Sequence, residues 1–281
     1  MTVPAPIGLL AELTHRCPLQ CAYCSNPVQL DRRQLEMQTG DWLRVFSEAN
    51  DLGVLQVHLS GGEPTARDDL EQIIGHCAKL ELYTNLITSG VMLNGERLKA
   101  IADQGLDHVQ LSLQDVDPLN ADQIGGFKGG HAKKLALGAA VVKLGLPLTV
   151  NAVIHRHNIQ NISEMVQLAL DMGAKRVEIA HVQYYGWALK NRAHLMPTRE
   201  QAVAVLRYGQ QQIEQELARI VADVQAQRGS IHRVDFKNPD VIIAIEIVGN
   251  EVRYRYDHET AAARLRWSRR RRTIRRAAER I

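Results

Sequence analysis

The stretch Thr14-His-Arg-Cys17-Pro-Leu-Gln-Cys21-Ala-Tyr-Cys24-Ser-Asn26 follows a short apolar run, Gly8–Leu13, near the start of the chain. Three and two residues separate its cysteines. Iron–sulfur clusters use thiolate ligands, and a loop with this spacing can place three thiolates around one cluster. No fourth cysteine lies nearby. The stretch therefore predicts a [4Fe–4S] cluster held by three cysteines, with one iron open to an external ligand.

Two other chemistries use cysteines in this way. Structural zinc needs four closed ligands, and His15 is the only other candidate nearby. Cys21 and Cys24 also form a C-x-x-C pair that is typical of redox dithiols. Metal-type spacing directly after a strand is the more specific signal, and it favours the cluster.

Outward from the cysteines, short β-branched runs alternate with longer amphipathic ones. The expected strands are Gly8–Leu13, Val54–Ser60, Leu82–Thr88, His108–Leu113, Leu148–Ile154 and Arg176–His181. The expected helices are Asp41–Leu52, Arg67–Leu80, Gly95–Gln104, His131–Leu144, Ile162–Met172 and Arg199–Gln227. Six βα units in a row predict an α/β fold with a parallel sheet and right-handed crossovers. A doubly wound sheet and a barrel fit this pattern equally well.

The pattern C-x-x-x-C-x-Tyr-C after the first strand resembles the signature of the radical S-adenosylmethionine (SAM) superfamily. This resemblance implies a partial (β/α)6 barrel of the TIM type. It also implies that the open iron binds the amino and carboxylate groups of SAM, that the reduced cluster cleaves SAM, and that the resulting radical takes a hydrogen from the substrate. In barrels of this kind, active sites lie at the carboxyl ends of the strands, where Cys17 is expected.

Further motifs fall at the same ends of the strands. Gly61-Gly62-Glu63-Pro64 follows the second strand, and the resemblance implies that it meets the SAM amino group; the alternative is a plain turn. Ser89 follows the third strand and could contact SAM or only cap a turn. The remaining residues expected to bind the cofactor are Tyr23, Ser112, Gln114, Asn151, Arg156 and His181.

Some of these residues have a second interpretation. Asn151, in an apolar strand, could contact the SAM ribose or form a structural hydrogen bond. His155 and His157 are expected in a solvated loop. Polar and aromatic residues that follow the sixth strand are expected to line a substrate pocket, although Trp187 could instead pack under a helix. These residues are Gln183, Tyr184, Tyr185 and Trp187.

Longer sequence segments resemble one family within this superfamily. THRCPLQCAYCSNP, SGGEPTARDDL, HVQLSLQD and EIAHVQYYGWALKNRAHLMPT are similar to the PqqE family of pyrroloquinoline quinone (PQQ) biosynthesis, over about residues 5–236. The resemblance implies a carbon–carbon bond made between a glutamate and a tyrosine of the precursor peptide PqqA. It also implies PqqD as a peptide chaperone and an electron donor such as flavodoxin. The alternative is a truncated protein that cleaves SAM without completing the cross-link.

The carboxyl-terminal part departs from that family. PqqE-like proteins continue into a SPASM domain with auxiliary clusters, but no cysteine follows Cys77 here, so auxiliary clusters are expected to be absent. Residues 1–236 are expected to form the barrel, and residues 237–281 a divergent segment. In that segment Val241–Val248 and Glu251–Tyr256 predict a hairpin. KNPDVIIAIEIVGNEV resembles part of THUMP-type RNA-binding domains, which leaves an RNA-binding chimera as a further alternative.

Charge and hydropathy set limits on location and partners. The net charge is +3, but residues 264–281 hold nine arginines and one acid, which leaves 25 basic and 30 acidic side chains elsewhere. The basic character therefore belongs to the end of the chain, and nucleic-acid binding by the barrel is not expected. No apolar run is long enough to span a membrane, and the amino terminus does not resemble a signal peptide. These features predict a cytoplasmic protein that binds no membrane.

Overall fold

The structure is a computed structural model that describes residues 5–204, 243–248 and 251–256. The chain divides into two compact units, Met1–Leu206 and Arg207–Ile281. No helix among the described residues is both long enough and apolar enough to cross a membrane.

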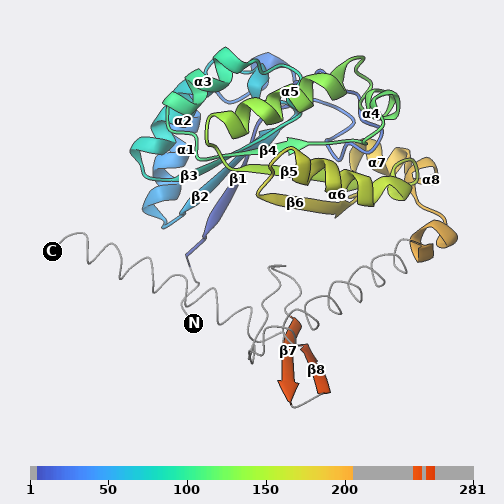
Figure 1. The fold of residues 1–281 in the computed structure, drawn as a ribbon. Coiled ribbons are helices and arrows are strands. Elements are labelled where there is room, and N and C mark those ends of the chain that lie inside the picture. Colours follow the sequence, from blue (N-terminus) through green and yellow to red (C-terminus); the bar gives the residue numbers. More distant parts are fainter. Residues whose placement is uncertain (1–4, 205–242, 249–250, 257–281) are drawn as a thin grey trace. The chain divides into compact units, whose positions relative to one another are not determined.

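A six-stranded parallel sheet forms the centre of the first unit (Figure 1). Its strands are β1 Gly8–Thr14, β2 Gln56–Gly61, β3 Tyr83–Thr88, β4 His108–Ser112, β5 Leu148–Ile154 and β6 Arg176–His181. Every neighbouring pair is parallel, and the order in space is the order in the chain. A doubly wound sheet reverses its strand order, so sequential order excludes that alternative. The predicted partial barrel is confirmed.

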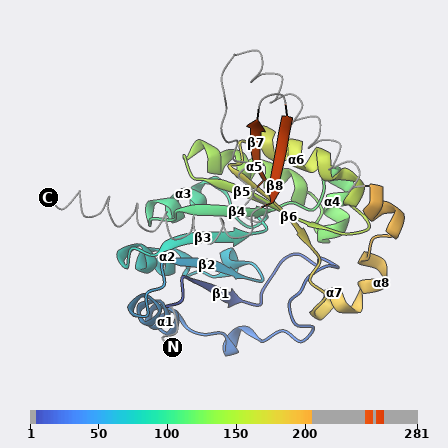
Figure 2. The same ribbon diagram turned by 90° about the horizontal axis from the view of Figure 1, so that it is seen from below.

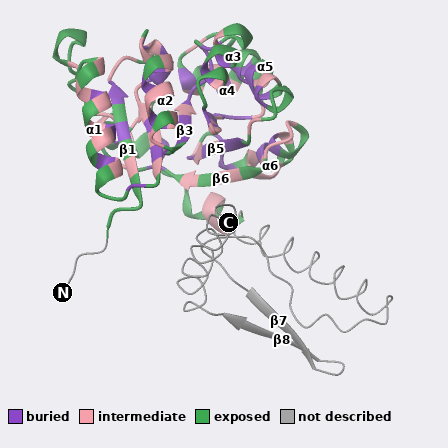
Figure 3. Cartoon of the chain, turned by 90° about the vertical axis from the view of Figure 1, so that its left-hand side faces the viewer, coloured by how far each residue is buried: buried purple, intermediate pink, exposed green. Residues whose placement is uncertain are grey.

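Helices follow the strands and cover the outer, convex face of the sheet (Figure 3). They are α1 Thr39–Asp51, α2 Leu70–Lys79, α3 Gly95–Asp103, α5 Gly130–Lys143 and α6 Ile162–Asp171. Successive side chains of a strand point to opposite faces, and alternate residues such as Val57 and Leu59 are fully buried beneath these helices. Phe46 of α1 and Cys77 of α2 belong to the same apolar core. Cys77 is therefore a core residue.

Several short elements were not predicted. They are α4 Pro118–Gly125, α7 Gly186–Lys190, α8 Arg192–Leu195 and the 3-10 turns Arg33–Leu35, Pro64–Ala66 and Ile159–Asn161. The carboxylate of Asp117 caps α4 by accepting from the backbone N–H of Asn120 at 2.7 Å. Residues 199–204 are helical and begin after Thr198, whose hydroxyl accepts from the N–H of Gln201. The rest of the predicted helix Arg199–Gln227 lies outside the described residues.

The described part of the second unit is an antiparallel hairpin. Strand β7 Ile243–Val248 pairs with β8 Glu251–Tyr256, and Val248 lies opposite Glu251. The hairpin predicted from the sequence is confirmed. The expected domain boundary at 236/237 and the arginine-rich end lie outside the described residues.

Candidate active site at the carboxyl ends of the strands

The cysteine loop leaves β1 at the end of the sheet toward which all strand arrows point, and α7 and α8 lie at the same end (Figure 2). The N–H of Cys24 donates to the carbonyl of Cys21 at 3.0 Å, which closes a turn between the two thiols. Cys17 is exposed, whereas Cys21 and Cys24 are half-buried. Among the described residues, no three His, Cys, Asp or Glu side chains are grouped closely enough to hold a metal ion.

The thiols interact electrostatically with one another and with Glu63 of the Gly61-Gly62-Glu63 motif. Although Cys17 is exposed as a residue, desolvation of its thiol raises its pKa to about 11, and Glu63, Cys21 and Cys24 add to that rise. Burial also raises the pKa of Cys21. These thiols are therefore protonated near neutral pH unless a metal ion binds them as thiolates.

The motif Gly61-Gly62-Glu63 lies directly against the start of the cysteine loop. The N–H of Gly62 donates to the carbonyl of Thr14 at 2.6 Å, and the N–H of Glu63 donates to the carbonyl of Arg16 at 2.7 Å. A Cβ atom on either glycine would overlap these backbone segments, and Gly61 has a φ of +119°. Only glycine permits so close an approach. The two motifs therefore form one unit of structure.

The carboxylate of Glu63 is fully buried and accepts hydrogen bonds from neighbouring protein groups. One oxygen, Oε1, accepts from the hydroxyl of Thr88 at 2.7 Å and from the hydroxyl and N–H of Thr65 at 2.7 and 3.2 Å. The other, Oε2, accepts from the N–H of Ser89 at 2.8 Å and from the Ser89 hydroxyl. These bonds occupy its lone pairs. The motif can therefore offer a ligand its backbone groups, but the Glu63 carboxylate is already satisfied.

Lys134 of α5 was not predicted from the sequence, yet its side chain reaches the ends of two strands. Its ammonium donates to the carbonyls of Ser89 at 2.7 Å and Ser112 at 3.1 Å, and the residue is only 2% exposed. Burial lowers its pKa to about 8, while Cys21, Glu63 and Cys17 act in the opposite direction. An ammonium group has three N–H donors, so one is left for an anionic ligand.

Tyr23, between the second and third cysteines, connects the loop to β4 and β5. Its hydroxyl accepts from Nε2 of Gln114 at 2.9 Å, and its ring lies 5.4 Å from the ring of His155. Burial raises the pKa of Tyr23 well above its usual range. Oε1 of Gln114 is buried and has no partner among the described residues. An acceptor left open in this way suits a ligand's N–H or O–H.

His155 corrects one expectation. It does not lie in a solvated loop, because it is 1% exposed, and burial lowers its pKa to about 4. Asn158 explains the buried turn: its side chain accepts from the N–H of His155 and donates to the carbonyls of Gln114 and Val153. This amide joins the ends of β4 and β5. His157 is exposed, as expected.

The other predicted cofactor residues divide into two groups. Ser112 pairs with Asn151, and Asn151 pairs with Glu178, so these three residues form a row across β4, β5 and β6. Arg156 points elsewhere, because its Nε donates to the carbonyl of Met196 at 2.8 Å. His181 is exposed at the end of β6.

The segment after β6 packs against the cysteine loop. The N–H of Ala188 donates to the carbonyl of Cys24 at 2.9 Å, and Nδ2 of Asn191 donates to the carbonyl of Ala22 at 3.1 Å. Gly186 has a φ of +49°, and a Cβ atom there would overlap the carbonyl of Asn26. The loop after the first strand is therefore held by the segment after the last.

The expected substrate residues lie on this segment in different environments. Tyr184 packs with a small apolar cluster that includes Tyr23, and Arg192 lies over its ring at 5.4 Å. Gln183 and Tyr185 are exposed, and so is Trp187, whose ring lies under the ammonium of Lys190. Trp187 therefore does not pack under a helix.

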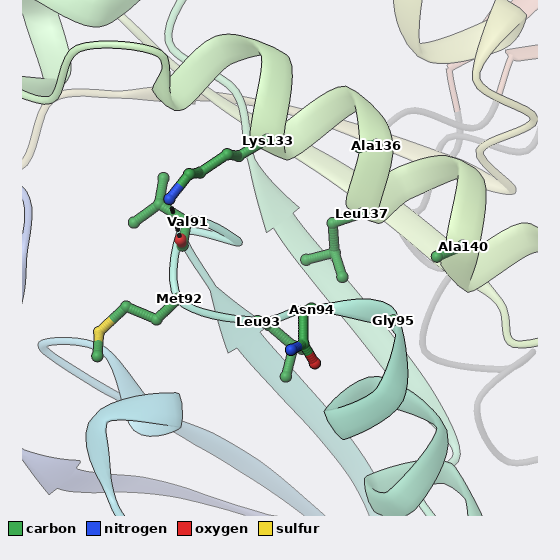
Figure 4. Close-up of a pocket in the computed structure, with 9 residues that line it drawn as sticks. All are labelled: Val91, Met92, Leu93, Asn94, Gly95, Lys133, Ala136, Leu137 and Ala140. Atoms are coloured by element: carbon green, nitrogen blue, oxygen red, sulfur yellow. Dashed lines mark hydrogen bonds between the residues drawn. The ribbon is translucent and has the colours of Figure 1, made fainter.

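A cavity of about 390 Å³ lies away from this site (Figure 4). It is formed between the β3–α3 connection, residues 91–95, and one face of α5. Lys133 lines this cavity, and its ammonium donates to the carbonyl of Val91 at 3.4 Å. None of the predicted site residues lines this cavity, so it does not identify the active site.

Comparison with known proteins agrees with the geometry. The family model of the Radical SAM superfamily matches residues 11–169, and the THUMP domain model matches residues 194–253. The first match covers more than half of the chain. The chain belongs to the radical SAM superfamily.

The curated relatives are more specific. A PqqA peptide cyclase of Methylocella silvestris is 61% identical over 201 residues, which are 72% of this chain and 54% of the relative. The PqqA peptide cyclase of Methylorubrum extorquens is 56% identical over 222 residues, or 79% of this chain and 58% of the relative. The PqqA peptide cyclase of Ruegeria pomeroyi is 50% identical over 240 residues, which are 85% of this chain and 61% of the relative. The chain thus spans little more than half the length of these relatives.

Solved structures show the same fold. SuiB of Streptococcus suis bound to S-adenosylmethionine superposes with a TM-score of 0.63 at 22% identity, covering 75% of this chain and 48% of SuiB. Coproporphyrinogen III oxidase (HemN) of Escherichia coli superposes with a TM-score of 0.56 at 13% identity, covering 74% and 52%. Both superpositions extend over most of this chain but only about half of the other protein, and they support the open barrel.

The residues present suit the groups that this superfamily implies. Thiols are the preferred ligands of iron–sulfur clusters, and three of them share one loop. The glycine pair lies directly against that loop, Lys134 has a donor to spare, and Oε1 of Gln114 has no partner among the described residues. A cationic donor and a neutral acceptor match the carboxylate and the hydroxyl groups of SAM.

Proposed function

We propose that this chain is a radical SAM enzyme whose Cys17, Cys21 and Cys24 hold a [4Fe–4S] cluster with one open iron. The observation that carries this proposal is the direct backbone contact between the cysteine loop and Gly61-Gly62-Glu63. When bound, the cluster and SAM together supply a carbon-centred radical that removes a hydrogen atom from the substrate. The residues of the chain bind, orient and shield these groups.

The SAM site would be shared among the strand ends. Backbone groups of Gly61 and Gly62 would meet the amino group, and Lys134 would neutralise the carboxylate. Oε1 of Gln114 would accept from the ribose, beside Tyr23. Ser112 and Asn151 lie in one row nearby and would complete the ribose contacts. Ser89 acts indirectly, because its hydroxyl is bound to Glu63.

The substrate we propose is the peptide PqqA, in PQQ biosynthesis. The names of the relatives and their 50–61% identity support it. The reaction would join a glutamate and a tyrosine side chain of PqqA through a carbon–carbon bond. PqqD would present the peptide, and a flavodoxin-like protein would supply electrons. The cytoplasm, where thiols stay reduced, is the compartment that suits such a cluster.

The test is an anaerobic assay with reductant, SAM, PqqD and PqqA. A peptide lighter by two hydrogens supports cross-linking. Formation of 5′-deoxyadenosine without that mass change supports SAM cleavage alone. If iron and sulfide analysis of the reconstituted protein finds no four-iron cluster, both activities are excluded.

A matched pair of lysines tests the SAM site. Lys134→Met removes the buried ammonium, and SAM affinity should fall by about tenfold or more. Lys133→Met removes the exposed neighbour and should leave the affinity unchanged. Equal affinities in the two variants would contradict the role of Lys134.

One observation favours another function for part of the chain. The THUMP match over residues 194–253 favours RNA binding by the carboxyl-terminal part. Deleting residues 264–281 would lower RNA affinity if the arginines there neutralise phosphates, and an unchanged affinity would exclude that role.

A further inference from the structure

A small apolar cluster, here called the mouth cluster, lies where the segment after β6 meets the cysteine loop. Its members are Val182, Ala188 and Leu195, against which Tyr23, Val153 and Tyr184 pack. Tyr23 comes from between the second and third cysteines, and Val153 shares the face of β5 that carries Asn151. The mouth cluster therefore joins the cysteine loop to the end of β5, beside the proposed SAM site.

Arg192, the first residue of α8, lies against the mouth cluster. Its guanidinium carbon is 5.4 Å from the centre of the Tyr184 ring, a distance at which the face of the ring attracts a cation. Nδ2 of the preceding residue, Asn191, donates to the carbonyl of Ala22 in the cysteine loop at 3.1 Å. The carbonyl of Arg192 itself accepts from the N–H of Met196 at 2.9 Å. Backbone and side chain of Arg192 are therefore both held in place beside the loop.

The charge of Arg192 has no counter-ion in the part of the chain that the structure describes. Its side chain is exposed, and it has neither a hydrogen-bond acceptor nor a carboxylate partner there. No Asp or Glu occurs in the sequence between His181 and Arg199. Several other arginines of the first unit do contact a carboxylate, namely Arg16, Arg33, Arg44, Arg67, Arg97 and Arg176. Arg192 is thus a positioned cation that is open to an anion from outside.

The contact with Tyr184 leaves the hydrogen-bonding groups of Arg192 free. A guanidinium is planar, and its five N–H donors lie in that plane, so a ring over its face occupies none of them. Two of these donors match the two oxygens of a carboxylate in a bidentate pair. The neighbouring cation, Lys190, lies 5.3 Å from the centre of the Trp187 ring, but an ammonium is a point charge that lacks this two-point match. The geometry of Arg192 therefore suits a carboxylate.

We infer that Arg192 binds a carboxylate of the substrate, and that this carboxylate belongs to the reacting glutamate of PqqA. The inference deepens the proposed function, on which it rests. Of the two side chains that the proposed reaction joins, only the glutamate is an anion at neutral pH. Arg192 would hold that anion beside the cysteine loop while Tyr184 supports the face of the guanidinium. Arg192 is then a substrate-binding residue that takes no part in bond formation.

The test measures binding of PqqA peptides to the reconstituted full chain by fluorescence anisotropy. One peptide is PqqA itself, and in a second peptide the reacting glutamate is replaced by glutamine. The wild-type protein should bind the glutamate peptide about fivefold more tightly, as expected for one exposed ion pair. A third peptide has an amidated carboxyl terminus and should bind as tightly as PqqA. If amidation weakens binding and the glutamine replacement does not, the assignment to the glutamate is overturned.

Three variants of the chain locate this preference. Arg192→Gln should bind the glutamate and glutamine peptides equally, whereas a purely structural role of Arg192 would weaken both and leave their ratio unchanged. Arg192→Lys keeps the charge but not the planar fork, and it should retain only part of the preference. Lys190→Gln removes a cation from the same short segment and should keep the full preference. Circular dichroism checks that all three variants are folded.

A second arm does not depend on PqqA. In ¹⁵N spectra, the α-amide of N-acetyl-glutamate should shift the Nε signal of Arg192, which is identified by its loss in Arg192→Gln, and N-acetyl-glutaminamide should not. If the glutamate probe shifts Arg192 but PqqA does not bind, the proposed substrate fails and the carboxylate site stands. If folded Arg192→Gln keeps the fivefold preference, or if no glutamate-containing ligand affects Arg192, the inference is overturned.

Discussion

The buried carboxylate of Glu63 accepts hydrogen bonds from both the N–H and the hydroxyl of Ser89, so the motif after β2 is tied directly to the end of β3. Glu63 thereby acts as a structural anchor inside a motif that resemblance assigns to ligand binding. Its own N–H reaches the carbonyl of Arg16 in the cysteine loop. One residue therefore connects the ends of three strands.

The first prediction concerns this anchor. Glu63→Gln replaces one carboxylate oxygen with an amino group that cannot accept from Ser89 or Thr88. We expect the free energy of unfolding to fall by about 2 kcal/mol, because buried donors lose their acceptor. Urea unfolding measures this loss. Glu12→Gln changes an exposed carboxylate on β1 and should have little effect; equal losses in both variants would contradict the anchor role.

The second prediction separates the two kinds of cysteine. Cys21→Ala should abolish 5′-deoxyadenosine formation and lower the iron content, because the cluster loses a ligand. Cys77→Ala removes a sulfur from the core and should cost about 1 kcal/mol of stability while iron content is unchanged. Iron analysis and thermal unfolding of both variants make the comparison. Activity retained in Cys21→Ala would refute the ligand assignment.

The third prediction concerns the contact between the segment after β6 and the cysteine loop. Gly186 and Gly145 both have positive φ, but only Gly186 lies against backbone, at Asn26. Gly145→Ala should cost about 1 kcal/mol from the left-handed conformation alone. Gly186→Ala should cost more, about 2 kcal/mol or above, and should speed hydrogen exchange at the N–H of Ala188. Equal costs in the two variants would show that this contact is dispensable.

The fourth prediction is a pH dependence. The hydrogen bond from Arg97 lowers the pKa of Glu71 from its usual value of 4.5, an effect that burial partly opposes. A carboxyl with a lowered pKa stabilises the fold above its unfolded pKa, and this stabilisation is lost as the pH falls through the folded pKa. Glu71→Gln should therefore destabilise the protein by about 1 kcal/mol near neutral pH, and the difference should shrink below about pH 4.5.

Urea unfolding at several pH values measures that difference. Glu96→Gln, in the first turn of α3, is the control and should show no comparable change with pH. A Glu71→Gln penalty that is constant down to low pH would contradict an ionic origin.

The strands could be predicted from their short apolar runs, and β5 and β6 have the expected bounds. Four of the strands, β2, β4, β5 and β6, also follow a glycine of positive φ that ends the preceding helix. Helix α4 was missed because the helix is short and several of its residues are polar. Its signals were local ones, Asp117 as a cap followed by Pro118 in the first turn. The sheet order needed the resemblance or the structure, because periodicity alone does not distinguish a barrel from a doubly wound sheet.

The site was predictable where it depends on motifs, and not where it depends on packing. Lys134 lies on a helix, where a lysine usually indicates a solvated face, and its burial follows from the position of α5 against two strand ends. The internal bonds of Glu63 and the unexpected burial of His155 likewise depend on neighbours that are distant in sequence. The spacing of residues along the sequence does not predict such contacts.

The contact of Ala188 and Asn191 with the cysteine loop also defines how much chain the site needs. The superfamily match ends at residue 169, before β6 and before both of these residues. A protein shortened to the matched region would keep all three thiols and the glycine motif but lose the backbone that supports the loop from the far edge of the sheet. The smallest piece able to preserve the loop's conformation therefore extends at least to Leu195, which closes the small cluster beside Tyr23.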